Sequence, residues 1–231
     1  MRRPISFLVL LAAVAAALVA VTLPGPSASA AVARQSAPAA AAPAPATATK
    51  IVYVRPVTVS GKPAPGWSVQ RLSGSVTCDG TSPSAVNPGI TSCYPTAYGL
   101  KACWKSARHT VLCVRDARVR KLVRVRYDGA YPSVEGPVEP APLDLVLTDG
   151  RTCLIRNGGA WGSPAQHPQW VGFDSCTRKA SVYGPGSSAD GINRSQSRWT
   201  VRIWRSGPDP DGRHLVTRGV TTGWVVGTAA D

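Results

Sequence analysis

The sequence predicts an all-β protein, a disulfide-stabilised antiparallel sandwich or small barrel that follows a signal peptide and a disordered linker. The chain of 231 residues contains 22 Gly and 21 Pro but two Phe and one Met, a composition typical of a turn-rich body rather than a helical bundle. Beyond the N-terminal apolar run, no segment repeats apolar residues with helical spacing, whereas several short runs alternate apolar and polar residues. Six cysteines, an even number, add the prediction of disulfides.

Residues 1–30 have the order of a secretory signal peptide. Arg2 and Arg3 precede an apolar run from Ile5 to Leu23, and the small residues Ala28 to Ala30 form a cleavage site. Because the run approaches the ~20 residues that cross a bilayer, an uncleaved anchor is the alternative. In both cases the rest of the chain is expected to be extracellular or in the cell envelope. It would contact the membrane only through an uncleaved N-terminal segment.

Residues 31–49, rich in Ala and Pro, predict a disordered linker, because they hold no apolar periodicity that a core could bury. Residues 50–231 are predicted to form the disulfide-stabilised β-domain. The stretch 128–142 contains three acidic residues, no basic residue and several prolines. It is expected to be a long loop or a boundary between two subdomains.

The six cysteines predict an oxidising compartment. Six cysteines allow 15 connectivities, and pairing between sequence neighbours is favoured because it closes short loops. This hypothesis pairs Cys78 with Cys93, Cys103 with Cys113, and Cys153 with Cys176. No Cys-x-x-Cys spacing of a zinc ribbon or redox motif occurs, so neither a metal nor another cofactor is predicted.

Four segments show strand patterns. Ile51 to Val59 is rich in Val, Ile and Tyr and precedes a Gly/Pro-rich stretch. Val119 to Tyr127 alternates Arg with Val, and the alternation slips at Lys121-Leu122, which predicts a β-bulge. Val201 to Arg205 repeats the alternation, and Gly223 to Thr228 is expected to be a closing strand.

A hairpin is predicted around Gly150. A three-residue loop, Thr148 to Gly150, would pair Leu145 with Cys153 and place the apolar residues of both strands on one face. A two-residue loop would place them on opposite faces. The longer loop also needs a left-handed residue at its third position, where Gly150 stands. The same register pairs Leu147 with Arg151 and Leu143 with Ile155.

Basic residues outnumber acidic ones, 26 to 12, and give a net charge of +14. Nine of them lie between residues 101 and 126, which hold a single acidic residue. Arg118, Arg120, Arg124 and Arg126 are expected to form a ladder on one strand face, suited to phosphate, sulfate or carboxylate groups. Two alternatives stay open: the arginines solvate an exposed face and discourage edge pairing, or the acidic segment 128–149 folds back and neutralises them.

The seven tryptophans form a second candidate group. Arg202 and Trp204 are expected to share the solvent face of their strand, where an indole beside a guanidinium suits sugar rings or nucleobases. Trp161 and Trp170, in one Gly/Pro-rich loop, are candidates for a glycan platform. Packing in the core is the competing interpretation.

Catalytic patterns are scarce. His109, His167 and His214 are isolated in the sequence, and neither an H-E-x-x-H nor a G-x-S-x-G motif occurs. Because a catalytic triad assembles in space, enzymatic activity stays open, and a protein without it is favoured. No catalytic residue is predicted.

Four short segments carry a resemblance: Cys153 to Trp161, Asp190 to Ser195, Trp199 to Arg202 and Val226 to Ala229. Over about residues 143–229, the chain resembles uncharacterised small secreted cysteine-containing proteins of high-GC actinobacteria. The Ala/Pro-rich linker and the preference for Arg over Lys are similar. The resemblance implies export, and it implies no activity and no site residues.

These observations predict a secreted, basic, non-enzymatic binding module for an anionic cell-envelope component or partner protein. The expected partner is an anionic polymer or an acidic protein surface at the cell envelope, and not a cytoplasmic nucleic acid. The alternative is a secreted hydrolase that acts on cell-wall material and uses His167 beside a loop cleft.

Overall fold

The structure is a computed structural model that describes residues 47–95, 99–156, 161–205 and 215–231. The predicted signal peptide and residues 31–46 of the predicted linker lie outside the described residues. All regular elements in the described part are strands, so the predicted all-β class is confirmed. In the same part of the chain there is no helix that could cross a membrane.

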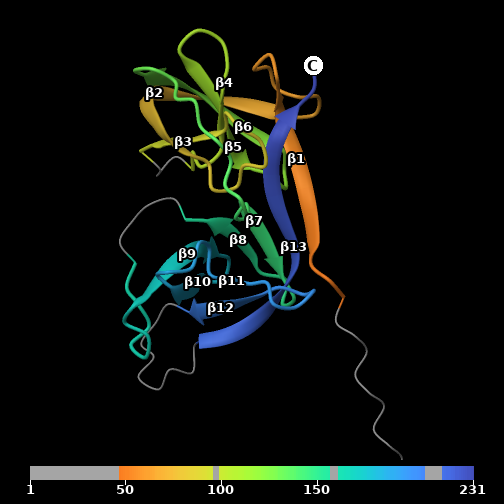
Figure 1. Ribbon diagram of the computed structural model, residues 1–231, viewed down its shortest axis with the longest axis vertical. Coiled ribbons are helices and arrows are strands. Elements are labelled where there is room, and N and C mark those ends of the chain that lie inside the picture. The colour runs from red at the N-terminus through yellow and green to blue at the C-terminus, as the bar shows by residue number, and fades with distance from the viewer. Residues whose placement is uncertain (1–46, 96–98, 157–160, 206–214) are drawn as a thin grey trace, which may run out of the picture. The chain divides into compact units, whose positions relative to one another are not determined.

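Five strands form a closed barrel (Figure 1). They are β2 (Ser68–Thr81), β3 (Thr91–Tyr94), β4 (Cys103–Lys105), β5 (Thr110–Asp116) and β6 (Lys121–Asp128). Consecutive strands pair antiparallel, and β6 closes the barrel by pairing parallel with β2. Closure leaves no open sheet edge among these strands.

The other strands form an eight-stranded sheet in the order β1-β13-β7-β8-β9-β10-β12-β11. They are β1 (Lys50–Thr58), β7 (Asp144–Leu147), β8 (Thr152–Ile155), β9 (Trp170–Cys176), β10 (Ala180–Pro185), β11 (Ile192–Asn193), β12 (Thr200–Arg205) and β13 (Leu215–Ala229). Because β12 also pairs with β13, six of these strands close into a ring. The segment 129–143, where a boundary was predicted, connects the barrel strand β6 to the sheet strand β7.

Each predicted strand exists. The bounds of β1, β6 and β12 differ from the prediction by one or two residues, whereas β13 begins at Leu215, eight residues before the predicted start at Gly223. The prediction of an antiparallel sheet is wrong for two pairs, because β1 pairs parallel with β13 and β2 pairs parallel with β6. Parallel pairing needs a long crossover between the partners, and here three strands separate β2 from β6 and eleven separate β1 from β13. The alternation of apolar and polar residues does not reveal the direction of pairing, because it is the same in parallel and antiparallel strands.

The hairpin formed by β7 and β8 has the predicted three-residue register. Leu145 pairs with Cys153. The Leu147 amide donates to the Arg151 carbonyl at 2.9 Å. Gly150 takes a φ of +77°, which closes the loop in the left-handed region where glycine is favoured.

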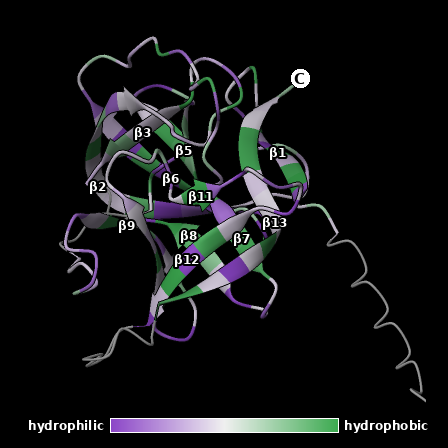
Figure 2. Ribbon diagram, turned by 60° about the horizontal axis from the view of Figure 1, so that its bottom comes forward, coloured by the Kyte–Doolittle hydropathy of each residue, from purple (hydrophilic) through white to green (hydrophobic). Residues whose placement is uncertain are grey.

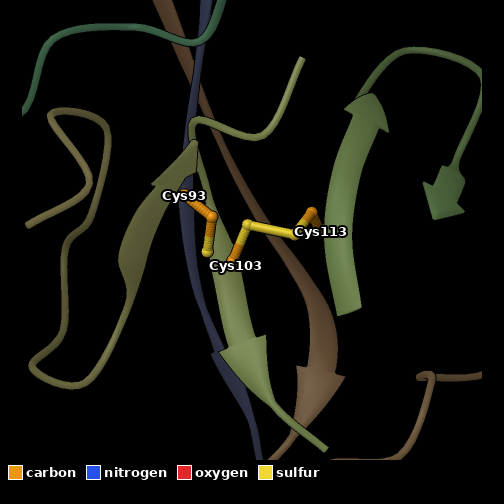
Figure 3. Close-up of side chains that lie close together, drawn as sticks. All are labelled: Cys93, Cys103 and Cys113. Atoms are coloured by element: carbon orange, nitrogen blue, oxygen red, sulfur yellow. A yellow bond between two sulfur atoms is a disulfide. The ribbon is translucent and has the colours of Figure 1, made fainter. Parts of the chain in front are cut away.

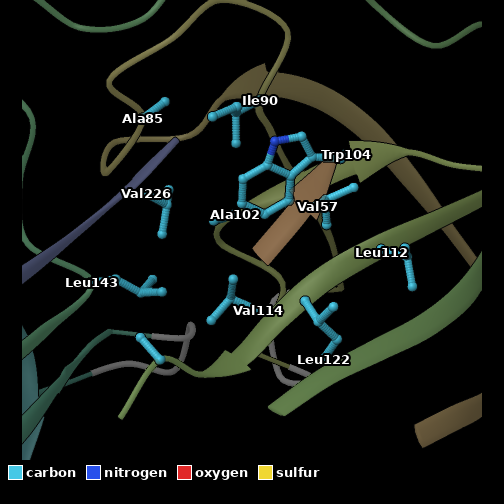
Figure 4. Packing of buried hydrophobic residues seen from close by; sticks show 11 residues of the cluster. Val57, Ala85, Ile90, Ala102, Trp104, Leu112, Val114, Leu122, Leu143 and Val226 are labelled. Carbon is cyan, nitrogen blue, oxygen red and sulfur yellow. The ribbon is translucent and has the colours of Figure 1, made fainter. Parts of the chain in front are cut away.

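Three buried clusters form the core. One fills the barrel and a second fills the ring of sheet strands. The third joins the two, because Trp104 and Leu112 of the barrel pack with Val57 of β1 and Val226 of β13 (Figure 4). Figure 2 shows hydrophobic and hydrophilic residues alternating along strands such as β12, as expected when one strand face is buried.

The disulfides are the three predicted neighbour pairs. The structure joins Cys78 to Cys93, Cys103 to Cys113 and Cys153 to Cys176. In each pair the two cysteines are direct register partners on adjacent strands. Each bond therefore cross-links an existing strand pair and lies in a buried cluster.

The first described residues are attached to the sheet before β1 begins. Thr49, the last residue of the predicted linker, donates from its hydroxyl to the Val220 carbonyl at 2.7 Å and accepts from the Trp199 amide at 2.8 Å. Arg198 Nε donates to the Thr47 carbonyl at 2.7 Å. The described end of the linker is thus bonded to the folded domain.

Replacing Gly61 by Ala is expected to lower the free energy of unfolding by about 2–4 kcal/mol. Gly61 has a φ of +76°, and an added Cβ would lie 2.6 Å from the Lys105 carbonyl oxygen, which is backbone and cannot swing away. Gly129 is the matched control, because its φ is +78° and a Cβ would meet nothing within 4 Å. Gly129→Ala should lower the free energy of unfolding by only about 1–2 kcal/mol. Equal losses for the two variants in urea unfolding would contradict the steric argument.

Candidate functional site

The predicted arginine ladder is not formed, because its first two members precede the strand. β6 begins at Lys121, and Arg118 and Arg120 lie in the β5–β6 turn, where Arg120 has a φ of +53°. The predicted bulge at Lys121-Leu122 is also wrong. The irregularity falls on the partner strand, where Arg115 is skipped between two register pairs. The slip in the sequence alternation marks the end of the turn.

Arg118 forms ion pairs within the fold. It lies 3.2 Å from Asp116 and 3.4 Å from Asp144, whose side chain is fully buried. Burial raises the pKa of Asp144 to about 6, and the charge of Arg118 opposes this rise. For this one arginine the acidic segment 128–149 does fold back on the basic one, so the charge of Arg118 is paired within the fold.

Arg124 and Arg126 do lie on one face of β6, and a residue that the sequence analysis did not select joins them. Arg71 of β2 is the register partner of Arg124. The three arginines line a hollow of about 340 Å³ on the barrel wall. We call this the arginine hollow, and its lining residues are Arg71, Leu72, Ala107, Thr110, Arg124, Val125 and Arg126.

The arginines of the hollow lack counter-charges. Among the described residues, Arg71, Arg124 and Arg126 form no ion pair, and Nε of Arg124 is buried without a hydrogen-bond partner. The nearest carboxylate group on the same strand, that of Asp128, accepts a hydrogen bond from the Ser75 hydroxyl. Other arginines of the described chain do have carboxylate partners: Arg118, Arg151, Arg194 and Arg218.

Edge protection does not explain these arginines. β6 pairs with β5 on one side and with β2 on the other, so it has no free edge. The alternative that the arginines discourage edge pairing is therefore wrong for Arg124 and Arg126, and the alternative that they solvate an exposed face stays open. Like charges on direct register partners repel one another, and Arg71 and Arg124 are such partners. An anion in the hollow would relieve this repulsion.

Arg202 and Trp204 lie on β12 of the sheet and not in the arginine hollow. Arg202 is exposed, and its guanidinium carbon lies 5.8 Å from the centroid of the Trp170 ring. Trp204 is half-buried and packs edge-to-face on Tyr183 with ring centroids 5.3 Å apart. The indole that accompanies Arg202 is thus Trp170 rather than Trp204.

The remaining chemical candidates are engaged in packing. Sγ atoms of Cys93, Cys103 and Cys113 lie within 4.8 Å of one another, but all three belong to disulfides and offer no thiolate to a metal (Figure 3). His167 stacks on Trp170 with ring centroids 3.9 Å apart, and no described carboxylate or hydroxyl hydrogen bonds to it. His214 lies outside the described residues.

Arg71 could not be selected from sequence, because it lies 53 residues before Arg124 in a stretch without charge clustering. The parallel closure of the barrel brings the two together. The fold and this site define a disulfide-stabilised β-barrel protein with an unneutralised cationic hollow.

Comparison of the chain with protein-family models, with curated proteins and with solved structures finds no match. The resemblance of residues 143–229 to secreted actinobacterial proteins therefore stays a hypothesis. The three disulfides are consistent with an oxidising, extracellular environment. The function is argued below from the geometry of the site.

Proposed function

We propose that the protein is a secreted, non-enzymatic binding module for an anionic polymer of the cell envelope, which it holds through the arginine hollow. The observation that carries the proposal is the cluster of Arg71, Arg124 and Arg126, which have no carboxylate partner among the described residues. The net charge of +14 attracts polyanions from a distance.

Guanidinium groups suit this ligand because each presents a planar fork of donors that matches phosphate, sulfate or carboxylate oxygens. Nε of Arg124 is buried and has no acceptor, so an anion in the hollow would also satisfy a donor that the fold leaves unpaired. The barrel strands hold the three side chains on two neighbouring strands, which lowers the cost of arranging them around a ligand.

Removing two of these arginines is expected to weaken polyanion binding by roughly tenfold for each arginine replaced. The variant is Arg71→Gln/Arg124→Gln, and the measurement is heparin affinity over a series of salt concentrations. Because each guanidinium that pairs with an anionic group of the polymer releases counterions, the slope of log affinity against log salt should fall by about one for each arginine replaced.

The matched control is Arg120→Gln/Arg205→Gln, which removes the same charge from two exposed arginines outside the hollow. It should lose far less affinity than the hollow variant. Equal losses would show that only net charge matters and would refute the site. Binding of polyglutamate without binding of heparin or isolated envelope polymer would instead identify an acidic protein surface as the partner.

A further inference from the structure

A second cavity, of about 330 Å³, lies away from the arginine hollow and shares no lining residue with it. Its apolar walls come from the eight-stranded sheet and from the connecting loops. They are formed by Pro83, Ala141, Pro142, Ile155, Phe173 and Ile192. The volume is at the lower end of the range for small-molecule sites, about 300–1,000 Å³. The cavity therefore suits a compact ligand rather than a polymer.

A β-bulge in β9 shapes this cavity. Val182 pairs with Asp174 and Tyr183 with Gly172, so Phe173 is the extra residue. A bulge turns neighbouring side chains toward the same side of a strand, and Gly172, Phe173 and Asp174 all line the cavity. Gly191 makes room for the Phe173 ring, since a Cβ there would lie 2.6 Å from that ring.

Asp174 is the polar group that the cavity leaves unsatisfied. The residue is 3% exposed, and among the described residues none donates a hydrogen bond to its carboxylate. A buried carboxyl without a partner is destabilising, and the bulge aims this one at a space that a ligand can enter. Asp190, which also lines the cavity, is already held by both Nη atoms of Arg194 and by the Ile192 amide. Of these two carboxylates, Asp174 is therefore the one that is available to a ligand.

A cation without a counter-charge lines the same cavity. Lys101 is half-buried, and no described carboxylate forms an ion pair with it. Arg156 lines the cavity beside it and adds positive charge, while its Nη1 donates to the Gly172 carbonyl at 3.3 Å. Lys101 and Asp174 do not pair with each other, so one ligand must span the space between them to satisfy both.

We propose that this cavity binds a small zwitterion of dipeptide size, whose ammonium group pairs with Asp174 and whose carboxylate pairs with Lys101. A dipeptide carries one ammonium and one carboxylate, so it brings one partner for each of the two opposite charges that line this cavity. The apolar walls would hold small side chains. This site is independent of the arginine hollow and of the polymer proposed to bind there.

Pairing with an ammonium group requires Asp174 to be ionised. Burial, together with the charges of Asp190 and Asp144, raises the pKa of the Asp174 carboxyl well above its usual value. Asp190 is paired with Arg194 and Asp144 with Arg118, and the basic residues Lys101 and Arg156 line the same cavity. Binding should therefore release a proton, and the affinity should rise as the pH is raised toward the ~8 at which the ligand's own amine loses its proton.

The test is titration calorimetry of the folded protein with L-alanyl-L-alanine, its N-acetyl derivative and its C-terminal amide. The wild type should bind the free dipeptide at least about tenfold more tightly than either derivative, because each derivative lacks one charge. Titration in two buffers of different ionisation enthalpy should show proton release on binding. Equal binding of all three compounds, or no binding of the dipeptide, would overturn the proposal.

Two variants connect each charge of the ligand to a residue. Asp174→Asn should bind the free dipeptide no more tightly than the N-acetyl derivative. Lys101→Gln should bind the free dipeptide no more tightly than the C-terminal amide. The controls Asp79→Asn and Lys105→Gln change exposed residues outside the cavity and should keep both preferences. If Asp174→Asn does not fold, binding of the dipeptide and its two derivatives to Lys101→Gln still tests the proposal. Preferences unchanged in Lys101→Gln would refute the assignment, and the hollow variant Arg71→Gln/Arg124→Gln should bind the dipeptide normally.

Discussion

Reduction of the three disulfides is expected to unfold the domain, because each bond should contribute about 3 kcal/mol in the chain-entropy model and the three together about 9 kcal/mol. The bonds close loops with sequence separations of 10, 15 and 23 residues. Domains of this size are stable by only about 5–15 kcal/mol. The barrel holds two of the three bonds, and these bonds attach the short strands β3 and β4, of four and three residues, to their neighbours. Little strand pairing remains to hold β3 and β4 when the bonds are reduced.

The measurement is urea unfolding, followed by circular dichroism, with and without a reducing agent. Three double variants separate the contributions, each replacing one cysteine pair by alanine. The bond between Cys153 and Cys176 closes the longest loop. Replacing this pair should lower the free energy of unfolding slightly more than replacing either of the others, since the entropic contribution grows with the logarithm of loop length. A reduced protein that unfolds cooperatively at the same urea concentration would refute the argument that the disulfides stabilise this fold.

Trp104→Ala is expected to lower the free energy of unfolding by about 3–5 kcal/mol. Trp104 is 4% exposed and lies in the cluster that joins the barrel to β1 and β13 (Figure 4). Its removal leaves a cavity in the cluster that holds these elements together. The indole Nε1 also donates to the Thr228 hydroxyl on β13 at 3.0 Å, and the variant cannot form this hydrogen bond.

Two further variants separate packing from hydrogen bonding at this position. Trp104→Phe keeps an aromatic ring and loses the donor, and Thr228→Val removes the acceptor and keeps the volume. Thr228→Val should cost about 1 kcal/mol, the net value of one hydrogen bond. Urea unfolding of the three variants gives the comparison. A loss for Trp104→Ala no larger than that for Thr228→Val would show that the indole does not support the junction.

Local features of the fold could be predicted from the sequence because they depend on near neighbours in the chain. The β7–β8 hairpin register follows from loop length and from Gly150, and it is confirmed. The cysteine pairs are neighbours in sequence and became register partners on adjacent strands. The parallel pairs β1–β13 and β2–β6 could not be predicted, since both partners show the same alternation whichever direction they run.

The candidate site was predicted in part. Arg124 and Arg126 lie on one strand face, as their spacing of two residues requires. Arg118 and Arg120 continue the same Arg-Val pattern but lie in a turn, and Arg118 forms an ion pair with the buried Asp144. The sequence did not indicate Arg71 or Asp174 as site residues. Barrel closure brings Arg71 to the arginine hollow, and the bulge in β9 brings Asp174 to the second cavity.

The sequence by itself determined the secondary structure class, the presence of disulfides and the excess of positive charge, all of which follow from residue type and short-range spacing. Only the tertiary structure decided which charges have partners. Whether a guanidinium or a carboxylate is neutralised depends on side chains that lie far away in the chain, and the electrostatic energy depends on distance and burial rather than on position in the sequence.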